Sequence, residues 1–344
     1  MAKDVKIGVS FDGFITLPES IAVAREAVAA GASSLWMAEH LGYREPMTSC
    51  MAFALSFPGI KVVPTAVSPY LRHPMPTAMA LATIAEASPG NVAIAVGVGN
   101  PMFLGESGLE VAKPVRAMRE SIEMLRGLFS GNPVEQTGML HTLKGARMGF
   151  MPPKPVEVYI APMKEKNLRL SGQIADGVVL SAGISSSFVK HSLSFVEEER
   201  SKAGRLAEPY VKAGYVYFLA STNQKEAYDT LRMKLAFLMR NRYIDDNIMH
   251  SGLPIDQQKI MAAIAARDFE AAAMLVSDDA VEAFAIGGTP QQCRKGIQRF
   301  IDAGLNELVL IMAGEEEDRT LGYDLIREFG NVNVEKNRVA LSDL

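Results

Sequence analysis

Short apolar runs alternate with amphipathic stretches along most of the chain. Eight runs have the length and content of strands, and they cover residues 5–11, 33–40, 60–67, 91–99, 156–162, 175–183, 211–220 and 306–314. Some, such as VAIAV within the fourth run, are apolar at successive positions. This pattern is typical of strands buried on both faces of a parallel sheet.

Between the runs, apolar residues recur at helical spacing. One helix is predicted to begin near Pro18 and end at Gly31, because proline suits a first helical turn and glycine a helix C-terminus. Others are expected at 74–88 and 114–129, and Thr289 has the position of a helix cap. Strands alternating with helices predict a (β/α)8 barrel, an α/β fold. An open doubly wound sheet remains the rival, because spacing alone does not show closure.

Two segments interrupt the alternation. Residues 133–153 hold Gly138, Gly145 and Gly149, and are expected to form a β-hairpin excursion. Residues 223–285 have a helical pattern and form an expected insertion before the last strand. A barrel with these additions suits the length of 344 residues, so one domain over 1–344 is predicted.

Composition narrows the classes of partner. Hydrophobic residues make up 48% of the chain and charged residues 22%, as in an ordinary globular core. A formal charge of −4 argues against nucleic acid as the main partner. The separated cysteines, Cys50 and Cys293, fit a reduced compartment. The first residues show no signal-peptide pattern, and no apolar stretch is of membrane-spanning length. A cytoplasmic protein without a membrane partner is expected.

In barrels of this class the active site lies at the C-terminal ends of the strands. The strand list therefore yields candidate site residues: Asp12; Glu39 and His40; Thr65, Ala66 and Val67; Gly97, Gly99 and Asn100; Pro162 and Met163; Ala182 and Gly183. Most of them are small. Small residues leave room for a large flat ligand at the mouth and let the backbone approach it closely.

Glu39-His40 is the sharpest chemical signal among these positions. A carboxylate and an imidazole at one strand end can share a proton, stabilise an anion or orient a substrate. A salt bridge within the loop, or a helix cap, explains the pair equally well. Asp12 is followed by glycine, and an Asp-Gly pair is more often a turn than a catalytic acid.

Two neighbouring helix starts, after the fifth and sixth strands, suggest a phosphate site. Segments 162–167 and 181–185 each lead from a strand into a helix, and free backbone N–H groups at helix N-termini bind phosphate. Lys164, Lys166 and Arg72 can add a basic rim. Ordinary helix starts without a ligand are the alternative.

Several common motifs are absent. Gly97-Val98-Gly99 lacks the G-x-G-x-x-G spacing, so a dinucleotide fold is rejected. The sequence has no H-E-x-x-H, C-x-x-C or G-x-S-x-G, which argues against zinc proteases, serine hydrolases and a metal site.

The chain resembles the bacterial-luciferase-like superfamily of flavin and deazaflavin enzymes over nearly its whole length. The resemblance is carried by LWMAEH, YLRHPMPTAMALATIAEASPGNVAIAVGVGN, KPVRAMRESIEMLRGLFSG, VYIAPMKEKNLRLSGQIADGVVL and AFAIGGTPQQCRKGIQRFIDAGLNELVL. Within the superfamily, SGLPIDQQKIMAAIAARDFEAAAMLVSDDAVEAFAIGGTP is similar to the methylene-tetrahydromethanopterin reductase branch.

This resemblance implies a barrel that holds FMN or coenzyme F420, a deazaflavin, at its C-terminal mouth. It implies a non-prolyl cis peptide bond at Thr65–Ala66 beneath the central ring of the cofactor. The cofactor phosphate is expected between the loops at Pro162-Met163 and Ala182-Gly183. Glu39 and His40 fall where deazaflavin members use an acid and a histidine near the ring, and a homodimer is expected.

One position departs from the resemblance. Methylene-tetrahydropterin reductases carry a catalytic glutamate near the end of the first strand, and Ser10 stands at that position here. A serine cannot supply the same proton at neutral pH. Asp12, two residues on, lies on the same strand face if the strand runs that far and is the candidate substitute.

The leading functional hypothesis is an oxidoreductase that moves a hydride between a reduced flavin-type ring and a small organic substrate. A two-component monooxygenase is the first alternative; it uses FMN and O2 and needs a separate reductase to supply reduced flavin. A non-catalytic flavin-binding homologue is the second, which the serine at position 10 keeps open.

Overall fold

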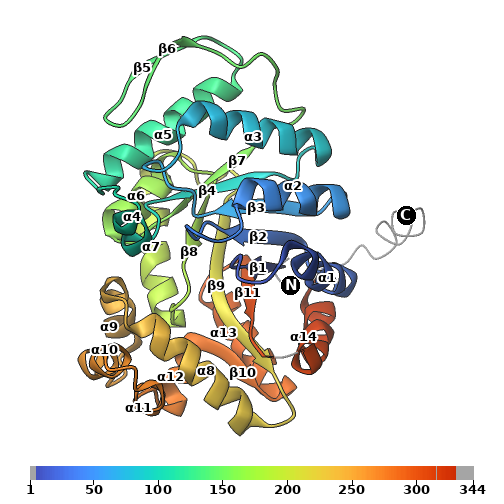
Figure 1. Cartoon of the computed structure of the whole chain (residues 1–344), viewed down its shortest axis with the longest axis vertical. Helices are drawn as coiled ribbons and strands as arrows, with labels where there is room; N and C mark the ends of the chain where they lie inside the picture. Colours follow the sequence, from blue (N-terminus) through green and yellow to red (C-terminus); the bar gives the residue numbers. More distant parts are fainter. Residues whose placement is uncertain (1–4, 315, 331–344) are drawn as a thin grey trace.

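Eight parallel strands form the wall of a nearly closed barrel in the computed structural model, which describes residues 5–314 and 316–330 (Figure 1). The strands are β1 (Lys6–Phe11), β2 (Ser34–Ala38), β3 (Lys61–Thr65), β4 (Ala93–Gly97), β7 (Glu157–Ala161), β8 (Gly177–Leu180), β9 (Val211–Ala220) and β11 (Glu307–Met312). Their order around the barrel is β3-β2-β1-β11-β9-β8-β7-β4. Isolated bridges Val62–Val92 and Val67–Val96 join β3 to β4. The predicted barrel is therefore confirmed over the open sheet.

Helices surround the wall: α1 (Leu17–Ala30), α2 (Pro46–Ser56), α3 (Pro74–Ala87), α4 (Pro101–Glu106), α5 (Pro114–Phe129), α6 (Glu165–Ile174), α7 (Ser186–Lys202), α13 (Pro290–Asp302) and α14 (Glu316–Phe329). Thr16 and Glu19 form a capping box at the start of α1, and Gly31 ends it with a left-handed φ of 110°. Thr289 caps α13 as expected. Helices α2 and α4 were not predicted, because α2 carries no charged residue to mark a solvent face and α4 has only six residues.

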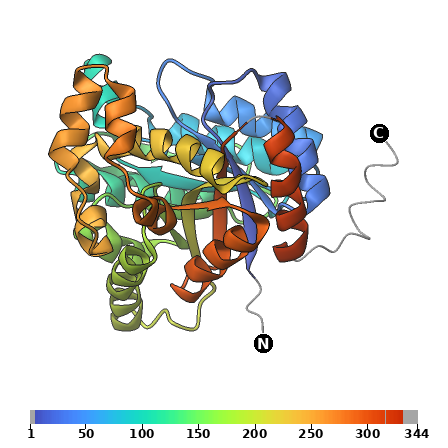
Figure 2. The same ribbon diagram turned by 90° about the horizontal axis from the view of Figure 1, so that it is seen from below.

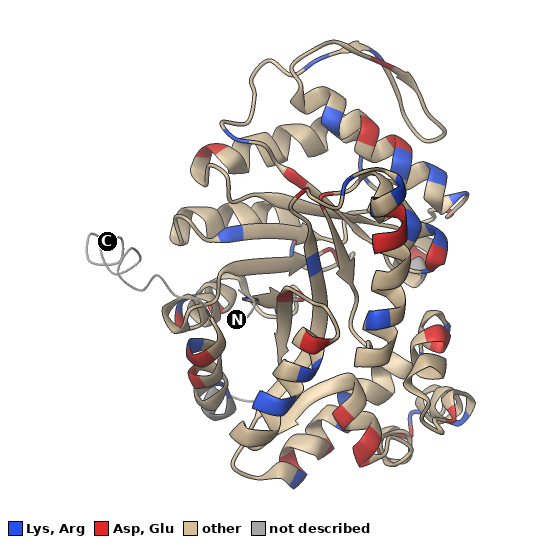
Figure 3. Cartoon of the chain, turned by 180° about the vertical axis from the view of Figure 1, so that it is seen from behind, with Lys and Arg blue, Asp and Glu red and all other residues tan. Residues whose placement is uncertain are grey.

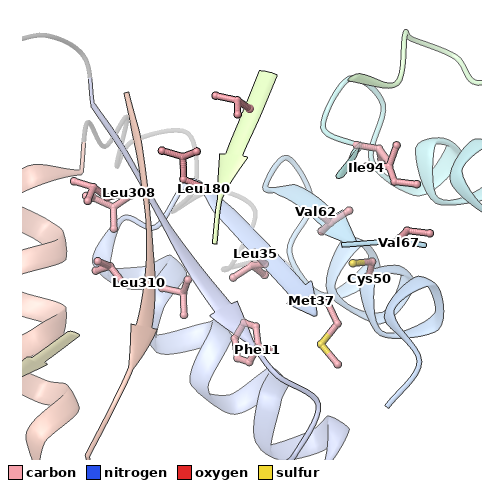
Figure 4. Close-up of a cluster of buried hydrophobic side chains, with 14 of the residues drawn as sticks. Phe11, Leu35, Met37, Cys50, Val62, Val67, Ile94, Leu180, Leu308 and Leu310 are labelled. Atoms are coloured by element: carbon pink, nitrogen blue, oxygen red, sulfur yellow. The ribbon is translucent and has the colours of Figure 1, made fainter. Parts of the chain in front are cut away.

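The side chains of the wall alternate between two cores. Those pointing inward fill the barrel and include Trp36, Val63, Tyr159, Val179 and Val309. Those pointing outward pack beneath the helices, and Figure 4 shows part of this outer core: Phe11, Leu35, Met37, Val62, Leu308 and Leu310. Both layers hold the strand ends in fixed positions.

A polar network closes the barrel at the N-terminal ends of its strands. Lys61 Nζ lies 2.7 Å from Glu157 Oε2 across the interior. Glu307, only 1% exposed, accepts a hydrogen bond from Ser34 Oγ at 2.5 Å, and Trp36 Nε1 donates to the same hydroxyl at 2.8 Å. Because charged and bulky side chains fill this end, a ligand is expected at the opposite mouth.

Two additions extend the barrel, and they lie at opposite ends of the long axis of the molecule (Figure 1). The predicted hairpin is present as β5 (Val134–Thr137) and β6 (Thr142–Ala146). The predicted helical insertion comprises α8 (Gln224–Met239), the 3-10 turn η1 (Arg242–Ile244), α9 (Asp245–Ser251), α10 (Gln257–Ala265), α11 (Phe269–Met274) and α12 (Asp278–Phe284). Its helices share a second hydrophobic cluster with Leu219 of β9 and Ala285 of β10, so the insertion packs against this side of the barrel (Figure 2).

A short strand that the sequence did not reveal follows the insertion. β10 (Ala285–Gly288) pairs with residues 217–220 of β9. It continues the edge of β9 that pairs with β8 over residues 211–214. Its sequence, AIGG, has only two larger apolar residues, so it lacks the run that identified the other strands.

Charges are interspersed on the surface. Lys and Arg alternate with Asp and Glu along the helices seen from behind, without a large patch of one sign in that view (Figure 3). Within the described part of the chain, no helix has both the length and the apolar content needed to cross a bilayer.

Candidate functional site

The floor of the candidate site lies where β3, β4 and β7 end. The peptide bond between Thr65 and Ala66 is cis, as expected. Gly97 lies so close that a Cβ built on it would be 2.7 Å from Ala66 Cβ and 3.2 Å from Ala161 Cβ. Only glycine fits at this position without pushing the neighbouring chain away. The three strand ends therefore form a floor of small residues.

Beyond the cis bond, the backbone returns to the barrel wall at Val67. Its N–H donates to the Ala95 carbonyl at 2.8 Å, and its carbonyl accepts from the Gly97 N–H at 3.1 Å. The Val67 side chain is buried and points into the outer core (Figure 4). Ala66 therefore borders the floor, whereas the Val67 side chain faces away from it.

The end of β4 supports the same loop from the other side. Gly99 has a φ of 88°, and a Cβ on it would lie 3.1 Å from Ser68 Cβ. Asn100 Oδ1 accepts from the Met102 N–H at 3.0 Å and caps α4. The Asn100 side chain is thus a helix cap, a role that the sequence did not show because α4 was missed.

Glu39 anchors the loop that follows the cis bond. Its carboxylate side chain is 4% exposed, and Oε2 accepts from the Ser68 N–H at 2.9 Å. Oε1 accepts from Arg72 Nε at 2.5 Å, while Arg72 Nη2 reaches Glu45 Oε1 at 2.6 Å. Burial works against the charge of Arg72, but Glu39 and Glu45 outweigh it and raise its pKa. The geometry shows the salt bridge that was one of the two interpretations of Glu39.

His40 is held with a defined ring orientation. Its Nδ1 lies 2.9 Å from the Asp12 carbonyl oxygen, which can only accept, so Nδ1 carries the proton. In the neutral ring, Nε2 is then the atom left to accept or relay a proton. The Asp12 carboxylate accepts from the Phe14 N–H at 2.9 Å, as in an Asx turn. The turn interpretation of Asp12 therefore matches the local geometry.

Aromatic rings surround His40, and the sequence did not identify them. Phe14 stacks on its ring with centroids 5.4 Å apart, and Phe103 lies edge-on at 6.1 Å. Tyr43 packs on Phe14 at 4.5 Å. Phe14 and Tyr43 are about half exposed. They lie two and three residues beyond the strand-end candidates, so a slightly longer search along each loop would have found them.

The start of α6 has the properties of an anion site. Lys164 occupies its N-cap position, and no side chain in the described chain caps the first turn by a hydrogen bond. Asn167, in that first turn, is 4% exposed, and its Oδ1 has no hydrogen-bond partner among the described residues. A buried carbonyl oxygen without a partner is costly and indicates a missing ligand or water. The amide can turn to offer its Nδ2 donor instead.

The loop after β8 lies beside this helix start, because β7 and β8 are neighbours. Gly183 has a φ of 88°, in the left-handed region that favours glycine. Ser185 caps α7 by accepting from the Phe188 N–H at 3.2 Å. The structure therefore brings Pro162-Met163 and Ala182-Gly183 together, and the helix start that stays uncapped is that of α6.

Two of the three predicted rim cations are already paired. Lys164 contacts two carboxylates of α9, and Arg72 contacts two glutamates. Lys166 is exposed. The residues present suit a phosphate-bearing flat cofactor: a floor of small side chains, and an uncapped helix start with an unpaired buried amide.

Comparisons with known proteins identify the family of the chain. The luciferase-like monooxygenase family matches residues 6–307. The 5,10-methylenetetrahydromethanopterin reductase of Archaeoglobus fulgidus is 26% identical over 310 residues, covering 89% of this chain and 92% of that protein. The F420-dependent glucose-6-phosphate dehydrogenase of Microbacterium testaceum is 25% identical over 258 residues, covering 72% and 71%.

A solved structure shows the same fold. It is the coenzyme F420 dependent tetrahydromethanopterin reductase from Methanopyrus kandleri, with a TM-score of 0.85 and 23% identity, covering 93% of this chain and 97% of that chain. Since the family match spans most of the sequence, the chain belongs to the luciferase-like monooxygenase family and is an oxidoreductase of that family.

Proposed function

We propose that the chain is a deazaflavin-dependent oxidoreductase, which uses coenzyme F420 to move a hydride to or from a small organic substrate. The observation that carries the cofactor part is the uncapped start of α6 with the unpaired buried amide of Asn167. FMN and F420 both present a phosphate to such a site. The printed names of the Microbacterium testaceum dehydrogenase and of the Methanopyrus kandleri reductase, which both give F420 as the cofactor, support F420 over FMN.

Each group of site residues then has a task. The first-turn N–H groups of α6 and the Asn167 amide hold the phosphate. The floor at Ala66, Gly97 and Ala161 lets a flat ring lie close to the backbone. Bound F420 supplies the hydride chemistry, and the protein supplies binding, orientation and proton handling.

Proton handling falls to His40 in this proposal. Ser10 stands where the related reductases carry glutamate, and the Asp12 carboxylate accepts a hydrogen bond within its own turn. The Asp12 carbonyl fixes the proton of His40 on Nδ1, so Nε2 can accept or relay a proton at the mouth. Glu39 acts through the loop: it positions the segment after the cis bond by binding Ser68 and Arg72.

Cofactor identity is tested by titrating the purified protein with F420 and, separately, with FMN while the visible spectrum is recorded. We expect saturable binding of F420, with FMN binding more weakly. Tight binding of FMN alone would contradict the deazaflavin proposal and favour the two-component monooxygenase. Binding of neither cofactor would overturn the cofactor assignment.

Turnover separates an enzyme from a non-catalytic binder. Oxidation of reduced F420 is followed without oxygen in the presence of methylenetetrahydromethanopterin, and reduction of oxidised F420 in the presence of glucose 6-phosphate, because relatives are named for these compounds. A rate increase with either compound, or with another small carbonyl or alcohol, supports the enzyme. A protein that binds F420 and changes its redox rate with no substrate would be a binding homologue.

A further inference from the structure

Helix α9 of the insertion lies against the loop that follows β8. Asn247 Nδ2 donates to the Gly183 carbonyl at 2.8 Å, and the Asn247 side chain is buried. Ser187, in the first turn of α7, donates from Oγ to the His250 carbonyl at 2.6 Å. Gly183 also packs on the insertion, because a Cβ built on it would lie 2.9 Å from Leu238 Cδ2. The conformation of this loop therefore depends on where α9 sits.

The same helix reaches the loop that follows β7. Lys164 Nζ lies 2.6 Å from Asp245 Oδ1 and 2.8 Å from Asp246 Oδ2, both in the first turn of α9. Lys164 is the N-cap residue of α6. One seven-residue helix thus contacts both loops that border the uncapped helix start.

A stacked histidine pair joins α9 to α7. The rings of His191 and His250 have centroids 3.8 Å apart and planes inclined by 26°. Phe188 lies 6.1 Å from the His250 ring, and Phe195 lies edge-on to His191 at 4.8 Å. Two neutral imidazoles stack favourably in such a setting, but two imidazolium rings at this distance repel each other.

The charged groups around the pair limit this repulsion without removing it. Burial lowers the pKa of His191, and His250 lowers it further, while Glu165 of α6 and Asp246 of α9 raise it by a smaller amount. The guanidinium of Arg169 in α6 lies 4.7 Å from the centroid of the Phe195 ring, which itself contacts His191. A histidine whose pKa is lowered by docking favours the docked state above about pH 6.5, and this contribution is lost as pH falls below that value.

We propose that α9 is a positioning element of the cofactor site, which holds the loops after β7 and β8 through Lys164, Asn247 and Ser187 and loosens when His191, stacked on His250, becomes protonated. The consequence for cofactor affinity rests on the function proposed above. The docking of α9 and its dependence on pH do not.

Hydrogen exchange of the protein without cofactor tests the docking directly. After correction for the intrinsic pH dependence of exchange, amides of 245–251 should exchange about three- to tenfold faster at pH 5.5 than at pH 7.5. His191→Phe and His250→Phe keep an aromatic stack without the charge and should abolish this difference. His141→Phe, in the distant hairpin, is the control and should leave it intact. Equal exchange at both pH values in the wild type would overturn the proposal, as would an undiminished difference in both stack variants.

Titration with F420 tests the coupling to the site. The wild-type dissociation constant should rise at pH 5.5 relative to pH 7.5 by a similar factor, and His250→Phe should reduce that rise. Asn247→Ala should weaken binding several-fold already at pH 7.5, whereas Gln258→Ala, an exposed change in α10, should not. A pH-dependent exchange without any F420 binding would refute the cofactor assignment alone. F420 affinity unaffected by Asn247→Ala would refute the positioning role alone.

Discussion

At the scale of single residues, Glu39 is the residue whose effect on turnover must be distinguished from its effect on stability. Glu39→Gln keeps the size of the side chain and an acceptor for Ser68, but removes the negative charge that faces Arg72. We expect turnover to fall about ten- to hundredfold, because the loop beneath the cofactor loses its fixed position. The free energy of unfolding should fall by no more than about 2 kcal/mol, since Arg72 still donates a hydrogen bond to Glu45.

Steady-state kinetics and denaturant unfolding measure the two effects. Glu45→Gln is the matched control, because it removes the other, more exposed carboxylate from the same guanidinium. It should lower turnover much less than Glu39→Gln. Equal turnover in the wild type and in Glu39→Gln would leave Glu39 with a purely structural salt bridge.

Asn167 offers a test in which binding and stability move in opposite directions. Its Oδ1 is buried without a partner, so Asn167→Leu removes a desolvated polar group and should leave the free energy of unfolding unchanged or raise it by about 1 kcal/mol. The same change should weaken F420 binding by about tenfold, because a donor to the phosphate is lost. Thermal unfolding and spectral titration measure these effects. A destabilised variant with normal affinity would place the amide outside the phosphate site.

At the scale of elements, sequence patterns located the barrel strands because parallel strands are buried on both faces and appear as apolar runs. Short elements without a run or a polar face were not predictable, as α2, α4 and β10 show. The strand-end rule also placed the candidate site at the C-terminal mouth, which stays a prediction. It could not find the contacts, because Glu39 meets Arg72 33 residues away and Lys164 meets Asp245 81 residues away, and no local pattern records such pairings.

The insertion should respond to mutation as a unit distinct from the barrel. Leu235 of α8 is fully buried in the hydrophobic cluster that the insertion forms with the edge of the barrel at Leu219 and Ala285. Leu235→Ala should destabilise that cluster by about 2–5 kcal/mol, since it leaves a cavity. Hydrogen exchange should then rise across α8–α12 and much less in β1–β4. Leu206→Ala, at an exposed loop position, is the control and should change neither region. A uniform rise across the barrel would show that the two cores unfold together.

At the scale of the whole molecule, the barrel has charged side chains at one end and small residues at the ends of β3, β4 and β7. At the charged end, burial alone would raise the pKa of Glu157, but Lys61 and the Tyr159 hydroxyl outweigh burial and lower it. A carboxyl with a lowered pKa in the folded state binds its proton less readily there than in the unfolded chain. Its contribution to stability is therefore present above about pH 4.3 and is lost as pH falls below that value.

Glu157→Gln should consequently lower the melting temperature by about 2 °C at pH 7, and the difference should vanish near pH 3. The effect is small because the Glu157 side chain is 39% exposed, so solvent screens the ion pair. It is not zero, because the Lys61 side chain is only 12% exposed and loses its carboxylate partner. Calorimetry at several pH values measures it, with Glu86→Gln on the exposed face of α3 as the control. A difference that persisted at pH 3 would mean that Glu157 stabilises the barrel by packing. A difference confined to higher pH would show that the ion pair itself stabilises the end of the barrel opposite the candidate site.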